Sequence, residues 1–333
     1  MKNKNYNIYG CCISVTGEDS LISAFESNFS PFNVDEITEP DIIVAPSTGQ
    51  ESLPITVKGG KYGMNFKYDS KNGGAVTIVY DKRIKGRGLS LVVNLCRYFL
   101  NWIDKGQAHA AAVSINDSAF AFFAPANTGK TTLGLRFVED GYSLIGDDWI
   151  IIDNAGNCYS YPQPMRIHDY NLAYSVDWCK RLYGVLGLPV NLAMRFRVAA
   201  RNYILPRLPS EALRYAGDHF LTRPVRSEPV LDMMKESKTE SKKLNAAFWL
   251  ERDEDIKELS VQEFTCDQMA DRIVATYLYE FIDCSRWYLF QHQLGNICPM
   301  VVSSVERLTS VARASVSQIP CYIVRIPANC QPT

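Results

Sequence analysis

The sequence predicts an α/β protein with a mixed sheet, made of a small N-terminal α/β region and a larger domain. Two observations lead to this class. Apolar runs of strand length alternate along the chain with amphipathic segments of helical period. One such run, ending at residue 124, leads directly into a glycine-containing loop and a helix. The boundaries that these patterns indicate are 1–88 for the N-terminal region, 89–106 for a bridging helix and 107–333 for the larger domain.

The N-terminal region alternates strand and helix patterns. Strand-like apolar runs occupy three stretches, residues 6–15, 41–45 and parts of 55–80. Apolar side chains recur at helical spacing over 18–29. The pair Asn72-Gly73 is a favoured hairpin turn and predicts that the strands on either side of it are neighbours.

The bridging helix has the clearest amphipathic pattern in the chain. Apolar side chains recur at spacings of three and four over residues 89–103, and Gly106 is predicted to end the helix. Such a helix would connect the N-terminal region to the larger domain.

The larger domain begins with a predicted β-hairpin. Residues 110–115 and 119–124 are apolar strands joined by a short polar turn. The segments that follow are a loop at 125–132, a helix at 133–140, a strand at 142–146, the pair Asp147-Asp148 and an apolar run at 149–152.

The rest of the chain alternates helical, proline-rich and polar segments. They are helical patches around 172–188, proline-rich breaks near 206–209 and 224–229, a polar loop at 235–243, a strand at 244–250, aromatic-rich helices within 261–294 and a last strand at 322–326.

Composition narrows the classes of function. Hydrophobic residues make up 47% and charged residues 21% of the 333 residues, as in ordinary globular proteins. The 35 basic and 36 acidic side chains give a net charge of -1, which disfavours nucleic acid as a partner. No apolar run has the length of a membrane span and no signal peptide follows the start, so we expect no membrane partner and a cytoplasmic protein. The ten cysteines form no Cys-x-x-Cys pair and are expected to be free thiols.

The loop Gly129-Lys130-Thr131 has the residues that phosphate binding requires. Backbone N–H groups at a helix N-terminus attract anions, a lysine reaches the outer phosphates, and a hydroxyl binds magnesium. We therefore expect the phosphates to lie on the loop residues Ala126, Asn127, Thr128, Gly129, Lys130, Thr131 and Thr132. Ala124 stands where the usual pattern has its first glycine, and Asn127 suits a left-handed backbone.

Asp147 and Asp148 follow Lys130 by 17 and 18 residues, with one helix and one short strand between them. This spacing predicts that both carboxylates return to the strand ends beside the loop. Phosphoryl transfer needs an anion that holds magnesium and a group that orients or deprotonates the attacking hydroxyl. His109 lies before the predicted hairpin, and the antiparallel strand that it starts would also begin near the loop.

These residues resemble the HPr kinase/phosphorylase superfamily, whose nucleotide-binding fold is shared with phosphoenolpyruvate carboxykinase. The resemblance is carried by three motifs within residues 109–152, namely His-Ala-Ala-Ala-Val from 109, Ala-Pro-Ala-Asn-Thr-Gly-Lys-Thr-Thr-Leu from 124 and Gly-Tyr-Ser-Leu-Ile-Gly-Asp-Asp from 141. Weaker likeness covers 244–252 and 319–327. The first 85 residues do not resemble the N-terminal domain of HPr kinases, and the glycine-rich signature linked to phosphorylase activity is missing.

The resemblance implies an HPr-kinase-like fold and a kinase that uses ATP and Mg²⁺. Lys130 and the loop backbone would hold the ATP phosphates, and Thr131 and Asp147 would bind Mg²⁺. Asp148 would act as the base on the acceptor hydroxyl, with His109 assisting, although the resemblance does not fix which aspartate takes which role. The acceptor would be a serine of a protein or peptide, as in kinases that modify ribosomal peptide precursors, or a small molecule.

Alternative functions remain open at this point. The altered loop favours a regulatory or scaffolding protein that binds ATP without transferring phosphate. A carboxykinase-like enzyme would need further arginines and metal ligands, and an ABC-type ATPase would need a Leu-Ser-Gly-Gly-Gln signature. Arg166 is a further candidate for phosphate contact, and a homo-oligomer is compatible with the sequence.

Overall fold

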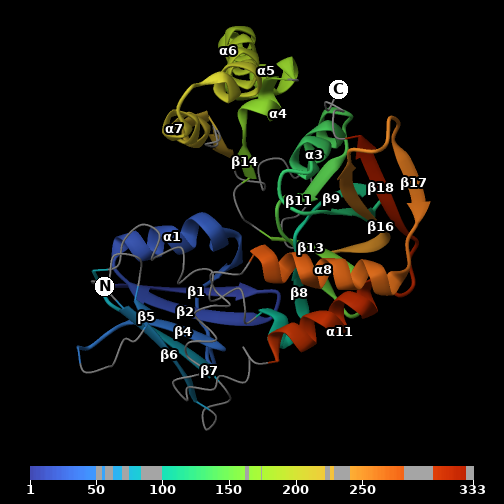
Figure 1. Ribbon diagram of the computed structural model, residues 1–333. Helices are drawn as coiled ribbons and strands as arrows, with labels where there is room; N and C mark the ends of the chain where they lie inside the picture. The colour runs from blue at the N-terminus through green and yellow to red at the C-terminus, as the bar shows by residue number, and fades with distance from the viewer. Residues whose placement is uncertain are drawn as a thin grey trace.

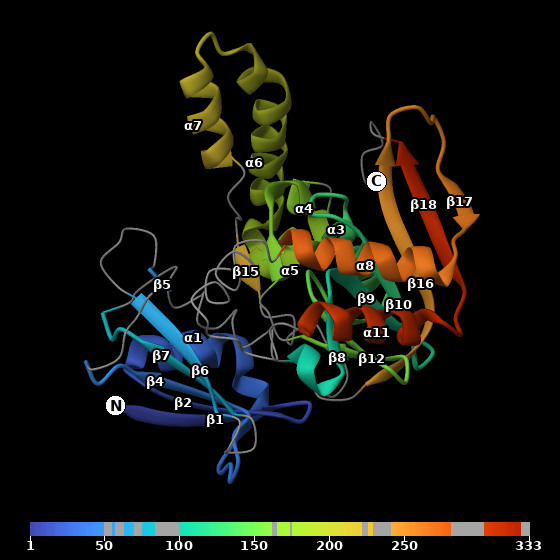
Figure 2. The same cartoon turned by 60° about the horizontal axis from the view of Figure 1, so that its bottom comes forward.

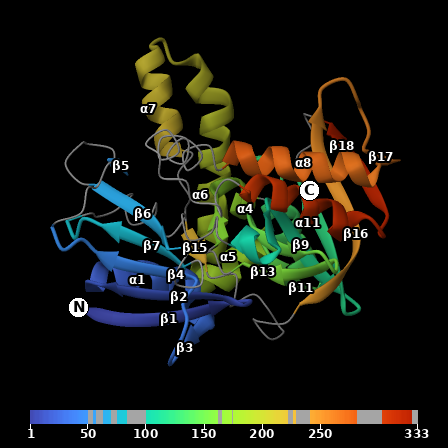
Figure 3. The ribbon, with the colours of Figure 1, turned by 90° about the horizontal axis from the view of Figure 1, so that it is seen from below.

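The computed structural model describes most of the chain. The described residues are 1–49, 55–56, 63–69, 75–83, 100–161, 165–173, 175–221, 226–228, 241–280 and 303–327. They form a mixed α/β structure with two large sheets and a helical projection, seen from three directions in Figures 1, 2 and 3.

The N-terminal region is a seven-stranded mixed sheet in the order β3-β1-β2-β4-β7-β6-β5. Its strands are β1 (Lys2–Ile8), β2 (Cys11–Gly17), β3 (Asn33–Val34), β4 (Ile42–Pro46), β5 (Ile55–Thr56), β6 (Gly63–Asp69) and β7 (Ala75–Tyr80). Helix α1 (Asp19–Phe29) lies along this sheet (Figure 1). The turn around Asn72-Gly73 lies outside the described residues, but β6 and β7 pair antiparallel on either side of it, as predicted.

The prediction of a single strand over 6–15 is wrong. The segment turns at Tyr9 and Gly10, and β1 and β2 pair antiparallel as a hairpin. Both turn residues have positive φ, 51° and 102°, which is the backbone of a tight two-residue hairpin turn. The pattern missed the break because apolar residues continue through both strands and Tyr9 is an unusual residue for that conformation.

The N-terminal region is packed against the larger domain. Phe25 and Phe29 of α1 are buried with Tyr6 in a cluster that also includes Tyr161 and Tyr277 of the larger domain. The hydroxyl group of Tyr9 donates a 2.8 Å hydrogen bond to the carbonyl of Ser160. Burying such large side chains contributes roughly 1.5–3 kcal/mol each. The two sheets therefore share part of one core.

The predicted bridging helix lies mostly outside the described residues. Its described end is a short 3-10 helix, Asn101–Ile103, which stops at Asp104 in a left-handed conformation with φ 56°. Strand β8 (Lys105–Ala108) begins immediately afterwards, so Gly106 lies in a strand and does not end a helix. A Cβ atom at Gly106 would lie 2.9 Å from a Val311 side-chain carbon, so close packing explains this glycine.

The larger domain is built on a nine-stranded mixed sheet with the path β11-β9-β10-β16-β13-β12-β8 and with β18 and β17 added beside β16. The strands are β9 (Ala110–Ile115), β10 (Ser118–Phe123), β11 (Ser143–Gly146), β12 (Ile150–Asp153), β13 (Asn157–Ser160), β16 (Lys242–Asp253), β17 (Ser260–Glu263) and β18 (Cys321–Pro327). The predicted hairpin at 110–124 is confirmed as β9 and β10. Parallel pairing of β10 with β16 and of β16 with β18 makes the sheet mixed.

Helices cover both faces of this sheet because its central strands carry apolar side chains on both. One face packs on α8 (Cys266–Glu280) and α11 (Ser304–Val316), through residues such as Ile273 and Val311. The other face packs on α3 (Lys130–Glu139) and α5 (Val176–Tyr183), through Leu135 and Trp178. Helix α3 begins three residues earlier than the sequence predicted, because its first turn starts at the glycine–lysine step of the loop.

A helical projection is formed by the part of the chain between β14 (Met165–Ile167) and β15 (Arg226–Glu228). These two strands pair antiparallel. It contains α4 (Asp169–Ala173), α5, α6 (Gly187–Ala199) and α7 (Glu211–Leu221). Figure 2 shows α6 and α7 standing side by side, away from both sheets. Large apolar side chains on this projection, including Val185, Phe196 and Tyr215, are well exposed.

No helix within the described ranges combines the length and the hydropathy needed to cross a membrane. The cysteines in those ranges are free thiols, at positions Cys11, Cys12, Cys158, Cys179, Cys266 and Cys321.

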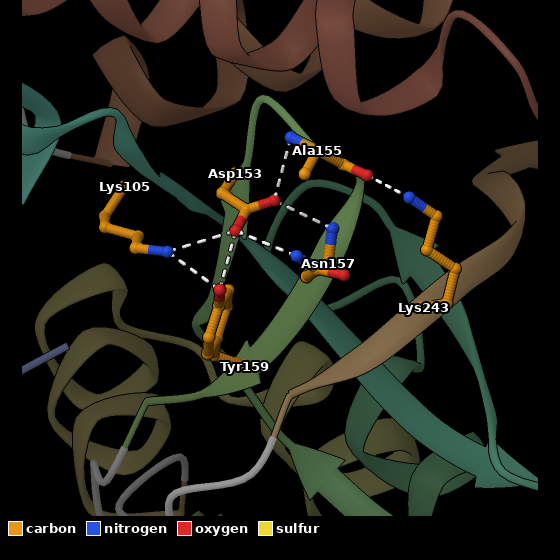
Figure 4. A network of polar contacts seen from close by, with 6 residues as sticks. All are labelled: Lys105, Asp153, Ala155, Asn157, Tyr159 and Lys243. Atoms are coloured by element: carbon orange, nitrogen blue, oxygen red, sulfur yellow. Dashed lines mark hydrogen bonds and ion pairs between the residues drawn. The ribbon is translucent and has the colours of Figure 1, made fainter.

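A polar network around Asp153 ties β8, β12 and β13 together (Figure 4). Asp153 accepts hydrogen bonds from Lys105, from the hydroxyl group of Tyr159 and from both nitrogens of Asn157. Burial alone would raise the pKa of Asp153, but these hydrogen bonds hold it at about 2.

The Asp153→Asn variant is therefore expected to be less stable than the wild type. A carboxyl group whose folded pKa lies below its unfolded value of about 3.9 contributes stability above that value and loses it as the pH falls through the folded pKa. We expect a loss of about 1–2 kcal/mol at neutral pH, after allowing for solvent screening, which shrinks as the pH falls from about 4 toward about 2. Urea unfolding between about pH 7 and about pH 3 measures this difference. Asp255→Asn, in an exposed turn, is the control, and a difference that does not change with pH would contradict the role of the charge.

Candidate functional site

Three chain segments meet at one edge of the larger sheet. Strand β10 ends at Phe123, and its neighbour β9 begins at Ala110, which pairs with Phe123. Strand β11 is antiparallel to β9 and therefore parallel to β10, so its end at Gly146 lies at the same edge. The loop before α3, the pair Asp147-Asp148 and His109 accordingly gather where these strands end. The sequence-predicted side chains are brought together by sheet topology.

The loop between β10 and α3 contains two residues in the left-handed conformation. Asn127 has φ 64° and Gly129 has φ 115°. Asparagine and glycine are the residues that adopt this conformation at least cost, as the sequence suggested for Asn127. Ala124 is buried and does not adopt positive φ, so the position of the usual first glycine needs no glycine here.

Gly129 caps the N-terminus of α3 without any side-chain hydrogen bond. The first turn of α3 presents its backbone N–H groups toward the loop, as the first turn of any helix does at its N-terminus. Ala126 and Asn127 are exposed, whereas the Thr128 hydroxyl group is buried and donates to the Pro125 carbonyl at 2.9 Å. Thr128 thus shapes the loop, while its neighbours face outward.

Lys130 lies inside the curve of the loop and is 4% exposed. Its ammonium group donates hydrogen bonds to the carbonyls of Ala124 and Pro125, at 2.9 and 2.8 Å. Burial lowers the pKa of Lys130, while the charges of Asp148, Asp147 and Glu280 act in the opposite direction. An ammonium group has three donors, so two bonds to the loop leave a third for an anion.

Thr131 and Asp147 form the inner part of the site. The Thr131 hydroxyl oxygen lies 2.9 and 3.1 Å from the two carboxylate oxygens of Asp147. Asp147 is 1% exposed, and burial together with the neighbouring Asp148 raises the pKa of its carboxyl group well above the usual range. A buried carboxylate of this kind is stabilised by a cation. A hydroxyl and a carboxylate side by side are oxygen ligands that Mg²⁺ accepts.

Asp148 forms the outer part of the site. Its backbone is left-handed, with φ 65°, which aspartate adopts more readily than most residues. The carboxylates of Asp147 and Asp148 lie in different surroundings, because the side chain of Asp148 is 30% exposed whereas Asp147 is buried. Oδ1 of Asp148 lies 3.5 Å from Nε2 of His109. Asp148 is therefore the carboxylate that a molecule arriving from solvent would meet.

His109 is held between two acids and an aromatic ring. Its Nδ1 atom lies 3.6 Å from Oε1 of Glu280, the last residue of α8, and both atoms are buried without a hydrogen bond in the described part of the chain. The imidazole ring lies 5.2 Å from the ring of Trp149, tilted by 31°. These neighbours fix the orientation of the imidazole ring toward Asp148.

The projection contributes residues on the other side of α3. Nδ2 of Asn171, in α4, donates a 3.0 Å hydrogen bond to the Thr132 hydroxyl group. Asp169, two residues earlier, is completely buried and lies near Arg197 and Arg201. Arg166 lies in β14, but its side chain is outside the described part of the structure.

The site contains residues that the sequence did not single out, chiefly Glu280, Asp169 and Asn171. They come from the helices α4 and α8, which follow the loop in the chain. A polar residue at a position where the helical period calls for burial is the signal that could have found Asp169. Nothing in the sequence pairs Glu280 with His109, 171 residues away.

The oxygen and nitrogen donors fit a magnesium–triphosphate ligand better than a protein-only metal cage. Among the described residues, no group of three or more His, Cys, Asp and Glu side chains is arranged to hold a metal ion. Mg²⁺ at phosphate-transfer sites uses one or two protein oxygens and completes its shell with phosphate oxygens and water. Thr131 and Asp147 supply such a partial set.

No family model matches the chain, and no curated protein matches it.

The Glu280→Gln variant tests whether the acid behind His109 positions the ring. For the ATP-dependent kinase activity that the sequence resemblance implies, we expect kcat to fall roughly tenfold, a modest part of the roughly 10²–10⁴-fold that acid–base groups contribute, with no loss of ATP affinity. Steady-state kinetics measure both quantities. Asp271→Asn, an exposed acid on the same helix, is the control, and unchanged kcat in Glu280→Gln would show that His109 does not depend on Glu280.

Proposed function

We propose that this protein is an ATP- and Mg²⁺-dependent kinase that transfers the γ-phosphate group to a hydroxyl acceptor. The observation that carries the proposal is the meeting of loop 124–129, Lys130, Thr131 and both aspartates at one sheet edge. The resemblance of these motifs to HPr-kinase-like proteins supports the same conclusion, including a phosphate-binding loop core related to that of phosphoenolpyruvate carboxykinase.

Nucleotide phosphates would bind on the loop backbone and the first turn of α3. The N–H groups at a helix start attract anions, and Lys130 is close enough to add a positive charge. Thr131 and Asp147 would hold Mg²⁺, which when bound neutralises charge on the phosphates. The buried position of Asp147 suits it to this role.

Asp148 would orient the acceptor hydroxyl group and accept its proton. Its partial exposure gives access to an arriving molecule, and its left-handed turn aims it away from Asp147. His109, 3.5 Å away, would stabilise the correct orientation of the carboxylate and share the proton. This arrangement supports the division of roles in which Asp147 is the metal ligand and Asp148 the base.

One observation favours the second candidate, an ATP-binding regulatory or scaffolding protein. Two hydrogen bonds of the Lys130 ammonium group go to the loop's own carbonyls, so part of its donor capacity already serves the loop. A protein that needed only to recognise nucleotide could keep this arrangement. The retained Thr131, Asp147 and Asp148 argue for transfer, because binding alone does not need two carboxylates beside the phosphates.

The deciding experiment is incubation of the full-length protein with Mg-ATP and serine-, threonine- and small-molecule hydroxyl acceptors. ADP release and mass spectrometry of the acceptors measure the transferred phosphate. Phosphate on a hydroxyl group, absent without Mg²⁺, is the expected result. ATP binding without phosphate on any acceptor would favour the regulatory candidate, and no ATP binding would reject both.

A further inference from the structure

A pair of arginines on the helical projection lies around one fully buried carboxylate. Nε of Arg197 is 3.4 Å from Oδ2 of Asp169, and Nη1 of Arg201 is 3.5 Å from Oδ1. Both arginines are about four-fifths buried by side chain, at 21% and 22% exposure. Asp169 Oδ2 has no hydrogen bond in the described part of the chain. Both guanidinium groups therefore face the same buried carboxylate.

The cluster lies beside the candidate site. Asp169 begins α4, whose Asn171 is hydrogen-bonded to Thr132 in the first turn of α3. The guanidinium group of Arg201 lies over the Tyr170 ring, 5.6 Å from its centre. Burial raises the pKa of Tyr170 to about 12, the charges of Asp148 and Asp147 add to this effect, and that of Arg201 opposes it. The Tyr170 phenol group thus lies within electrostatic reach of both the catalytic acids and the arginine.

The ion pairs are not needed to hold α6 against α4. Nδ2 of Asn191 donates to the carbonyls of Leu172 and Ala173, at 2.6 and 3.2 Å, and Nε of Arg195 donates to Ala173 at 2.9 Å. These bonds already connect the two helices. Buried ion pairs add little net stability, because desolvation offsets the attraction, and contacts of 3.4–3.5 Å are longer than charged hydrogen bonds. A role beyond helix packing accounts better for the cluster.

We propose that Arg201, supported by Arg197, forms a second anion-binding subsite that takes the terminal phosphate group of a nucleoside triphosphate. The inference rests on the proposed function, since it concerns the same nucleotide. A guanidinium group has five donors in a planar fork and pairs with phosphate through two of them. Asp169 positions the guanidinium groups, and the loop binds the inner phosphates from the other side. The subsite therefore distinguishes ATP from ADP.

The experiment compares the affinities of the full-length protein for Mg-ADP and for the magnesium complex of the β,γ-imido analogue of ATP by titration calorimetry. In Arg201→Ala, we expect affinity for the triphosphate to fall roughly tenfold to a hundredfold, while ADP affinity stays within about twofold. Arg201→Lys, which keeps the charge and loses the fork, should lie between the wild type and Arg201→Ala. Arg207→Ala is the matched control, because this exposed arginine of the projection bonds only the Tyr203 carbonyl among the described contacts.

The outcomes separate the two proposals. An equal loss of both affinities in Arg201→Ala, or no loss of either, overturns the subsite while leaving nucleotide binding by the wild type intact. Failure of the wild type to bind either nucleotide overturns the proposed function itself. Thermal unfolding of each variant shows whether it folds. If Arg201→Ala does not fold, the ratio of triphosphate affinity to diphosphate affinity in Arg201→Lys decides. A ratio unchanged from the wild type would overturn the subsite.

Discussion

Replacing Lys130 by alanine is expected to weaken nucleotide binding strongly. The ammonium group is buried inside the loop and is the cation nearest the proposed phosphates. Hydrogen bonds to charged groups contribute roughly 1.5–3 kcal/mol each, so losing the lysine should weaken ATP binding at least about a hundredfold. Titration of Mg-ATP against the wild type and the variant measures the difference.

Two further variants make this result specific. Lys130→Met keeps the length of the side chain and removes its charge, so it separates loss of the cation from collapse of the loop. Lys180→Ala, an exposed lysine on α5 whose side chain is 62% exposed, is the control and should bind ATP as the wild type does. ATP affinity retained in both Lys130 variants would mean that the loop does not hold phosphates.

The Asp148→Asn variant is expected to bind Mg-ATP normally and to transfer almost no phosphate. Asparagine has the same shape, accepts a left-handed backbone and lacks the basic carboxylate, so the turn at φ 65° should survive. General-base groups contribute roughly 10²–10⁴-fold to rate, and kcat should fall within that range. Single-turnover transfer to the acceptor, measured beside ATP affinity, separates chemistry from binding.

Asp117→Asn is a matched control for this substitution. Asp117 also has positive φ, 66°, but lies at the far tip of the β9–β10 hairpin, where its carboxylate contacts Lys242. Its replacement should leave transfer unchanged. Full activity in Asp148→Asn would mean that another group is the base. Loss of ATP binding in the same variant would instead identify Asp148 as a ligand of the metal or phosphates.

Local patterns predicted the elements around the site well. The β9–β10 hairpin, the strand before Asp147 and the strand at 244–250 all appear near their predicted positions, because each is a run of strand-forming residues bounded by polar turns. The failures have equally local causes. Apolar character continues through the turn at Tyr9, and a glycine at 106 that is required by packing against α11 resembles a helix stop.

The chemistry of the loop could be inferred from the sequence, whereas the surroundings of His109 could not. Glycine, lysine and threonine in this order at a helix start predict phosphate binding without reference to distant residues, because these groups act from adjacent positions. Glu280 lies near His109, and Arg201 lies over the Tyr170 ring, only because the segments that carry them pack on the sheet and on α4. Helical periodicity shows which face is apolar but not which neighbour it meets.

The sequence alone determined a mixed α/β chain with a Gly-Lys-Thr loop at a helix start and two acids at a strand end, because short motifs and their spacing depend on local backbone geometry. Only the tertiary structure decided that Asp147 is buried and Asp148 partly exposed, and which distant charges face them. Burial and charge proximity depend on contacts between segments far apart in the chain, so they appear only once the sheet and its helices are assembled.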